Sequence, residues 1–287
     1  MNVNSSLSHK KQEPEKKVLY IVGTPIGNLY DISSRAIKIL KGVSLIACED
    51  TRRTKKLMAK YEISNQVISF NKENSFKKSP QLIRDIKEGK SIALVSDAGM
   101  PGICDPGEEL VREARINSIK IICIPGPCAA TTALVTSGMS SSRFIFEGFL
   151  PKKKIERERI LLQISKREIT TIIFESPHRL KKLLKELKEY CGGEKEIHIS
   201  RELTKIYEEN INNSIDEVMN EFENKEILGE ITIVIKGVAK KETSKINKIY
   251  LKEELHELVK AGLSLTAASK YIAKKNNIAK RIIYNLY

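Results

Sequence analysis

Cysteine is sparse in this sequence, and its spacing excludes several classes of site. The five cysteines among 287 residues form no C-x-x-C pair, and no cysteine–histidine cluster has zinc-site spacing. We therefore expect reduced thiols and no metal. Apolar runs of the roughly 18 residues that a membrane span needs are also lacking, as is the apolar core of a secretory signal. These absences favour a cytoplasmic protein without a membrane anchor.

Acidic residues are too few to balance the basic ones. The chain has 50 Lys and Arg against 36 Asp and Glu, a net charge of +14. Such an excess favours a polyanionic partner, and nucleic acid is the commonest one. The alternative is a surface that is rich in lysine without a binding role, so the placement of the charge has to decide.

The first half of the chain alternates short apolar runs with helical patterns. This alternation predicts βαβ units and a mostly parallel sheet with helices on its faces. The expected strands are 18–22, 45–48, 67–70, 92–95 and 119–124, and the expected helices are 32–40, 51–60, 75–87, 108–115 and 129–136.

A second alternating set follows residue 143. It predicts strands at 143–150, 170–174, 195–199, 204–208 and 230–236, with helices at 156–164, 179–190 and 214–223. Short helical patterns resume after a polar linker at 240–248. We expect a disordered leader (1–17), an N-terminal α/β domain (18–140), a C-terminal α/β domain (141–239) and a basic helical appendix (240–287).

Three strands of the first domain end in Gly/Pro-rich loops that open onto helices. They are "YIVGTPIGN" (20–28), "LVSDAGMPGICDPG" (94–107) and "CIPGPCAATTA" (123–133). In open α/β sheets, ligands bind at the carboxyl ends of the strands, and glycine lets the backbone approach them closely. Three such loops at one edge predict a binding crevice.

The type of ligand is narrowed by two missing motifs. Neither the P-loop pattern nor the dinucleotide pattern G-x-G-x-x-G is present. The loops are rich in Ala, Met, Ile and Pro and poor in Lys and Arg. This composition suits a ligand with an apolar adenine face and no phosphate, and S-adenosylmethionine fits that description.

Six motifs in order carry a resemblance to a known family. They are "LYIVGTPIGNLYDISSRAIKIL", "ACEDTRRTKKL", "LVSDAGMPGICDPGEELV", "IPGPCAATTAL", "FEGFLP" and "FESPHRL". Over residues 18–287 the chain resembles the S-adenosylmethionine-dependent ribosomal RNA small subunit methyltransferases I, of the tetrapyrrole-methylase fold class. The resemblance implies 2′-O-methylation of a decoding-centre cytidine in 16S ribosomal RNA. It also implies two α/β domains with the cofactor in the cleft between them, and a homodimer.

The same resemblance implies a set of cofactor contacts. They are Pro25, Ala98, Gly99, Met100, Ile103, Cys128, Ala129 and Glu175. The chain departs from the family pattern at Met100 and Cys104, where small polar residues are usual. A flexible, apolar methionine is compatible with a cofactor loop through backbone contacts.

Methyl transfer to a hydroxyl depends mainly on alignment of the reacting atoms, and a nearby base contributes further. The candidate catalytic residues are Asp97, at a strand end, and His178, in "ESPHR". Each has a structural alternative: Asp97 as a brace for its loop, and His178 as an ordinary first-turn helix residue. In "EDTRRT", Arg52 and Arg53 are candidates for gripping RNA phosphate, or solvated charges behind an Asp50 helix cap.

The C-terminal segment 258–287 carries basic charge of one sign. It has six basic residues and no acidic ones, and it resembles a helix-turn-helix. We expect it to dock on RNA, through Lys270, Lys274, Lys275, Lys280 and Arg281.

Two other functions stay open. A tetrapyrrole or diphthine-type methyltransferase would share the fold but take a small-molecule or protein substrate. A non-catalytic nucleic-acid-binding protein would use the basic segment without the crevice.

Overall fold

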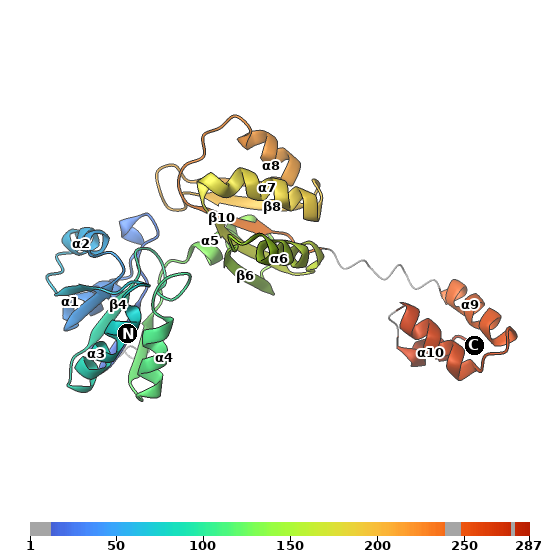
Figure 1. Cartoon of the computed structure of the whole chain (residues 1–287), viewed down its shortest axis with the longest axis horizontal. Helices are drawn as coiled ribbons and strands as arrows, with labels where there is room; N and C mark the ends of the chain where they lie inside the picture. The colour runs from blue at the N-terminus through green and yellow to red at the C-terminus, as the bar shows by residue number, and fades with distance from the viewer. Residues whose placement is uncertain (1–12, 239–247, 277–278) are drawn as a thin grey trace, which may run out of the picture. The chain divides into compact units, whose positions relative to one another are not determined.

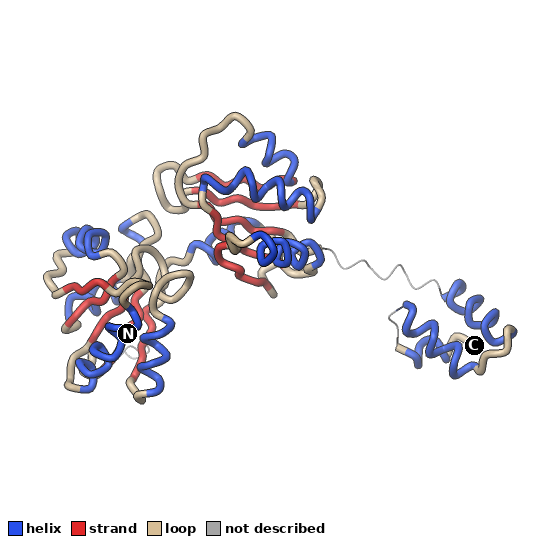
Figure 2. Tube along the Cα trace, in the orientation of Figure 1, coloured by secondary structure: helices blue, strands red, loops and turns tan. Residues whose placement is uncertain are grey.

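The computed structural model describes residues 13–238, 248–276 and 279–287. The chain divides into two compact units, Met1–Gly237 and Val238–Tyr287 (Figure 1). The first unit contains two five-stranded sheets, and the second consists of helices (Figure 2). No helix among the described residues is long and apolar enough to cross a membrane.

The first sheet is parallel throughout, with strand order β3-β2-β4-β1-β5. Its strands are β1 (Val18–Val22), β2 (Leu45–Cys48), β3 (Val67–Ser69), β4 (Ile92–Val95) and β5 (Lys120–Ile124). Every residue of β1, β2 and β4 is buried. Continuous apolar runs are typical of parallel strands, because helices cover both of their faces.

The helices of this half lie on opposite faces of the sheet. They are α1 (Ser34–Gly42), α2 (Thr51–Lys60), α3 (Ser75–Lys87) and α4 (Glu108–Ile116), and a short 3-10 helix, η2, spans Leu29–Asp31. One core packs α1 and α2 against Val18, Tyr20 and Val22 of β1. The other packs α3 and α4 against the intervening Leu19 and Ile21. Alternate residues of one strand therefore serve two cores.

The second sheet is mixed, with strand order β6-β7-β10-β8-β9. Its strands are β6 (Phe144–Phe149), β7 (Thr170–Glu175), β8 (Glu196–Arg201), β9 (Glu209–Ser214) and β10 (Ile231–Ile235). Only the β6–β7 pair is parallel. Helices α6 (Lys154–Lys166), α7 (Pro177–Cys191) and α8 (Ile215–Phe222) pack on one face.

Helix α5 (Ala129–Ser137) covers the other face of the second sheet. Its Ala130, Ala133 and Leu134 pack with Ile172 of β7 and Val234 of β10. The sequence places this helix in the first domain, whereas its packing joins it to the second sheet. Small residues suit this position, because they let the helix approach the sheet closely.

One strand prediction is wrong. The sequence predicts a strand at 204–208, but β9 lies at Glu209–Ser214 and is paired with β8. Residues 202–208 form a turn in which Glu202 and Thr204 have positive φ values of 53° and 67°. The polar β9 sequence "ENINNS" has little of the apolar alternation by which strands are recognised.

The segment before β1 contacts the first sheet where it is described. Glu13 forms an ion pair with Arg35 of α1 at 2.6 Å, and Glu15 pairs with Lys120 of β5. The first twelve residues of the predicted leader lie outside the described part of the chain.

The C-terminal unit contains α9 (Lys248–Lys260), α10 (Leu265–Asn276) and α11 (Lys280–Tyr284). Its small core includes Leu255, Ile272 and Ile283, one from each helix. The three helices agree with the predicted helical appendix, whose first residues, 240–247, lie outside the described residues.

Candidate functional site

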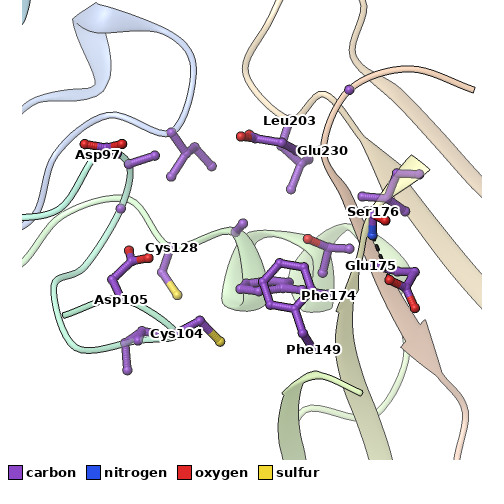
Figure 3. A pocket seen from close by; sticks show the side chains of 18 of the residues that line it. Asp97, Cys104, Asp105, Cys128, Phe149, Phe174, Glu175, Ser176, Leu203 and Glu230 are labelled. Atoms are coloured by element: carbon purple, nitrogen blue, oxygen red, sulfur yellow. Dashed lines mark hydrogen bonds between the residues drawn. The ribbon is translucent and has the colours of Figure 1, made fainter. Parts of the chain in front are cut away.

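A cavity of about 420 Å³ lies between the strand-end loops of the first sheet and the edge of the second sheet. We call it the larger cavity. In Figure 3, Asp97, Cys104 and Asp105 of the β4–α4 loop lie on one side, and Phe149, Phe174, Leu203 and Glu230 lie on the other. The remaining lining residues are Ile26, Glu49, Arg53, Ala98, Gly99, Met100, Ile103, Cys128, Ala129, Glu175, Ser176, Pro177, Ser200, Gly229, Ile231 and Thr232.

Backbone hydrogen bonds hold the first two loops together. Thr24 N donates to Gly99 O at 2.9 Å, and Gly99 N donates to Thr24 O at 3.1 Å. The Ser96 hydroxyl also donates to Gly99 O at 3.2 Å. Gly99 has φ +81°, and a Cβ there would lie 3.3 Å from Ile26 Cγ2. A side chain at this position would therefore strain both the backbone and the contact between the loops.

Two glycines bring the first and third loops into contact. A Cβ on Gly23 would lie 2.7 Å from Gly126 Cα and 2.7 Å from Met100 Sδ. A Cβ on Gly126 would in turn lie 2.8 Å from Gly23 Cα. The backbones therefore meet directly, and the three loops form one packed surface.

A contact between Cys104, which lines the larger cavity, and Gly148 joins the two halves. Gly148 lies at a register shift of β6 and has φ +65°. A Cβ there would lie 2.8 Å from Cys104 Sγ. The thiol at position 104 thus packs against the glycine of the second sheet. This contact accounts for a small, partly buried side chain at this position.

The larger cavity is acidic. Glu49, Asp97, Asp105, Glu175 and Glu230 line it, with Arg53 as the single basic residue among its lining. Burial, and then repulsion from Glu49, raises the pKa of Asp105 to about 6. Burial, and then Asp97, raises the pKa of Glu49. Carboxyl groups crowded in this way favour a cationic ligand, which would relieve their repulsion.

Asp97 braces the start of α2. Its Oδ1 accepts a hydrogen bond from Asp50 N at 2.9 Å, and its Oδ2 lies 3.6 Å from the Arg53 guanidinium. Asp50 in turn caps α2 by accepting from Arg52 N at 2.8 Å. The Asp97 carboxylate therefore joins the ends of β2 and β4, and in the described part of the chain its Oδ2 has only the long contact with Arg53.

Glu175 is the centre of a buried ion-pair network. Arg179 Nε lies 3.0 Å from its Oε1, and Arg157 Nη2 lies 3.4 Å from its Oε2. Oε1 also accepts a hydrogen bond from Ser176 N at 2.9 Å. Arg157 has a second partner in Glu186 at 2.8 Å. The carboxylate is thus occupied by protein groups at the end of β7.

The structure brings together most of the residues proposed as cofactor contacts. Seven of the eight line the larger cavity: Ala98, Gly99, Met100, Ile103, Cys128, Ala129 and Glu175. The eighth, Pro25, lines a second cavity. Of the two candidate catalytic residues, Asp97 lines both cavities, whereas His178 is exposed at the start of α7 and lines neither.

The second cavity, which we call the adjoining cavity, measures about 290 Å³. It shares Ile26, Arg53, Asp97, Ala98 and Glu230 with the larger one. Its other lining residues are Thr24, Pro25, Gly27, Leu29, Thr54, Lys56, Leu57, Ser96 and Lys205.

The two arginines of "EDTRRT" differ in their placement. Arg53 lines both cavities. The Arg52 guanidinium forms an ion pair with Asp50 at 2.7 Å, is 88% exposed and lines neither cavity. Hydrogen bonds from Arg52 lower the pKa of Asp50 to about 2. The structure thus links Arg52 to the helix cap.

The basic residues proposed for RNA docking are exposed on the C-terminal unit. Lys270, Lys274 and Lys275 lie on α10, and Lys280 and Arg281 lie on α11. Lys275 forms an ion pair with Glu254 of α9 at 2.5 Å. Within the described residues, the other four form no ion pair.

Sequence reasoning missed much of the second-sheet wall. Phe149 and Phe174 stack edge to face, with ring centroids 5.7 Å apart. Ser200 lies in β8, Leu203 lies in the turn that follows β8, and Glu230 directly precedes β10. Phe149 lies in the quoted motif "FEGFLP", which is a usable signal. Phe174 lies in the motif "FESPHRL". Ser200, Leu203 and Glu230 have no local motif, because the pairing of distant strands brings them together.

Candidate metal ligands do not gather among the described residues. Within ranges 13–238, 248–276 and 279–287, no group of three His, Cys, Asp or Glu side chains is arranged to hold a metal ion.

Comparison with known proteins gives consistent matches. The model of the family Tetrapyrrole (Corrin/Porphyrin) Methylases matches residues 18–218. A Synechocystis sp. protein named Ribosomal RNA small subunit methyltransferase I is 38% identical over 269 residues, which cover 94% of this chain and 96% of that protein. A relative of the same name from Thermotoga maritima is 48% identical over 219 residues, covering 76% of this chain and 98% of that protein.

A solved structure shows the same fold. It is a uroporphyrin-III C-methyl transferase from Thermus thermophilus complexed with S-adenyl homocysteine. The TM-score is 0.54 at 14% sequence identity, and the match covers 76% of this chain and 96% of that chain. With the relatives above, these matches show that the chain belongs to the ribosomal RNA small subunit methyltransferase I family, within the tetrapyrrole methylases.

Proposed function

We propose that this protein transfers the methyl group of S-adenosylmethionine to 16S ribosomal RNA in the small ribosomal subunit. The acceptor is the ribose 2′-hydroxyl of a cytidine in the decoding centre. The observation that carries the proposal is the larger cavity, whose apolar walls and carboxylates suit an adenosine with a positive sulfonium centre. The names of the relatives support ribosomal RNA as the substrate.

The lining of the larger cavity fits this donor chemically. Apolar side chains on both sides, including Ile103 and Phe174, suit the faces of an adenine ring. Asp97, Asp105 and Glu49 supply negative charge for a cation. A nucleotide cofactor would require donors for its phosphates, and Arg53 is the single basic lining residue. When bound, S-adenosylmethionine supplies an electrophilic methyl group.

In this proposal the residues of the chain contribute to catalysis mainly by aligning the reacting atoms. The paired backbones of Thr24 and Gly99 and the packed glycines 23 and 126 fix the loops without mobile side chains. Such rigidity holds reacting atoms in line and supplies most of the rate enhancement of a displacement. The brace at Asp97 keeps Arg53 at the wall that the two cavities share.

Asp97 is a better candidate than His178 for a role next to the acceptor. Asp97 belongs to the shared lining, and among the described residues its Oδ2 has only the 3.6 Å contact with Arg53. His178 is exposed and absent from both linings. We propose that Asp97 orients the hydroxyl and that His178 has no catalytic role.

The C-terminal unit serves RNA docking in this proposal. Its exposed basic residues on α10 and α11 suit phosphate contacts. We further propose that the protein acts in the cytoplasm and, as the resemblance implies, that it forms a homodimer. Light scattering would give twice the monomer mass for a dimer, and the monomer mass would contradict it.

Labelled S-adenosylmethionine tests the proposal against its alternatives. The protein would be incubated with unmethylated small ribosomal subunits, a tetrapyrrole and a cell protein fraction. We expect label on the RNA alone. Label on the tetrapyrrole or on protein would favour the other substrates of this fold class. Lack of cofactor binding in calorimetry would favour a non-catalytic RNA-binding protein.

A further inference from the structure

The adjoining cavity differs in charge from the larger cavity. Arg53, Lys56 and Lys205 line it, together with Asp97 and Glu230. Lys56 and Lys205 are absent from the lining of the larger cavity. The larger cavity is therefore acidic through Glu49, Asp97 and Asp105, whereas the adjoining cavity adds two cations. The five residues common to both linings form a shared wall. Neighbouring compartments with such different charge suit two different ligands.

Two of these cations are available to an anion. Lys56 forms neither an ion pair nor a hydrogen bond within the described residues, and it is exposed. Among the described residues, Arg53 forms one ion pair, with its guanidinium 3.6 Å from Asp97 Oδ2. The two residues are three apart on α2, so they lie on the same face of the helix. A phosphate between them would receive donors from both side chains.

Lys205 has a different role, because carboxylates already surround it. Its Nζ lies 2.7 Å from Glu202 and 3.0 Å from Glu230. This group holds the turn after β8 against the strand β10. The adjoining cavity therefore has its free positive charge on the α2 side.

We propose that the adjoining cavity binds the acceptor nucleotide, with its phosphate held by Lys56 and Arg53. The inference rests on the proposed function and extends it by naming the acceptor's subsite. A ribose next to that phosphate lies within reach of the shared wall, where Asp97 and Ala98 belong to both linings. The apolar side chains of Leu29 and Leu57 in this lining suit the sugar and base.

Lys56→Ala tests the phosphate contact, with Lys55→Ala as a matched control. Lys55 is exposed on the same helix and lines neither cavity. For Lys56→Ala we expect KM for unmethylated small subunits to rise about tenfold, the loss of one charged hydrogen bond. The salt slope of RNA binding should fall by about one. Lys56→Arg should restore both, and cofactor affinity should stay unchanged in all three variants.

Leu29→Trp tests the cavity itself. Leu29 lines the adjoining cavity and is absent from the lining of the larger one. The larger side chain should lower RNA methylation at least tenfold and leave the cofactor Kd within about twofold, since only one compartment is filled. Normal methylation by Leu29→Trp would overturn the inference, as would equal effects of Lys55→Ala and Lys56→Ala. If the unmodified protein binds cofactor but methylates no RNA, the proposed function itself fails.

Discussion

Thr24 and Gly99 exchange two backbone hydrogen bonds, with N···O distances of 2.9 and 3.1 Å. This pair fastens the loop after β1 to the loop after β4, at the edge of the first sheet where the larger cavity opens. The pair involves main-chain atoms alone, so its geometry depends on the backbone conformation of Gly99. The positive φ of Gly99 therefore helps to set the shape of the larger cavity.

Gly99→Ala should weaken cofactor binding by about tenfold or more. The added Cβ meets Ile26 Cγ2 at 3.3 Å, and the φ of +81° strains an L-residue by roughly 1–2 kcal/mol. Calorimetric titration with S-adenosylmethionine measures the loss. Gly89→Ala is the matched control, because Gly89 has φ +115° with open space around its Cβ position. It should lose stability but keep its affinity, and equal affinity of the two variants would contradict this role of Gly99.

Asp105→Asn should stabilise the protein above neutral pH. Folding raises the pKa of Asp105 from 3.8 to about 6, because the folded protein favours the protonated carboxyl. The contribution of Asp105 to protein stability is therefore fully present below pH 4 and is lost as the pH rises through 6. The asparagine avoids this loss. We expect roughly 1 kcal/mol at pH 7.5, discounted because solvent reaches the site, and none at pH 4.

Urea unfolding at pH 4, 5.5 and 7.5 measures this difference. Glu73→Gln serves as the control, since Glu73 is exposed at the end of the β3–α3 loop. This variant should not reproduce the gain of Asp105→Asn. A gain for Asp105→Asn that stays constant from pH 4 to 7.5 would show that the charge of Asp105 is not its cause.

Glu175→Gln should act mainly on stability. The substitution removes the ion pairs that Glu175 forms with Arg157 and Arg179. The buried Arg157 keeps its ion pair with Glu186. Loss of one partner in a buried ion pair costs about 3 kcal/mol. Glu196→Gln, which breaks a surface pair with Lys236, should cost less than about 1 kcal/mol. Unchanged unfolding combined with a large loss of cofactor affinity would instead make Glu175 a direct cofactor contact.

Replacement of Lys270 and Lys274 by alanine should reduce RNA affinity and its salt dependence. Each lysine that neutralises a phosphate adds about one to the salt slope, so the double variant should lose about two. Lys275→Ala should change the slope less, because this side chain already pairs with Glu254. Filter binding over a range of salt concentrations gives the slopes. Identical slopes for all variants would remove the C-terminal unit from RNA binding.

The first sheet could be predicted nearly residue by residue, for a physical reason. Its central strands β1, β2 and β4 are buried on both faces, so they stand out as short apolar runs between amphipathic helices. The exposed and polar β9 lacks that pattern and was misplaced. Helix α5 has small or apolar residues on all sides, so its sequence carries no sign of which sheet it covers.

The residues of the candidate site also differ in whether the sequence could predict them. Ala98, Gly99 and Met100 were predictable because a strand-end loop with glycines marks a ligand edge. Asp105 belongs to the same loop motif, but its raised pKa depends on burial and then on Glu49 from another loop. Leu203 and Glu230 join the wall only through strand pairing in the second sheet. Side chains that meet through tertiary contacts leave no local signal in the sequence.

Nucleoside mass spectrometry of the methylated RNA tests the central claim most directly. Small ribosomal subunits that lack the modification would be incubated with the protein and S-adenosylmethionine carrying a deuterated methyl group, and the RNA digested to nucleosides. We predict that the deuterium appears in 2′-O-methylcytidine, from a fragment of the decoding centre of 16S ribosomal RNA. Deuterium in a base-methylated nucleoside, or none in RNA while the cofactor still binds, would contradict it.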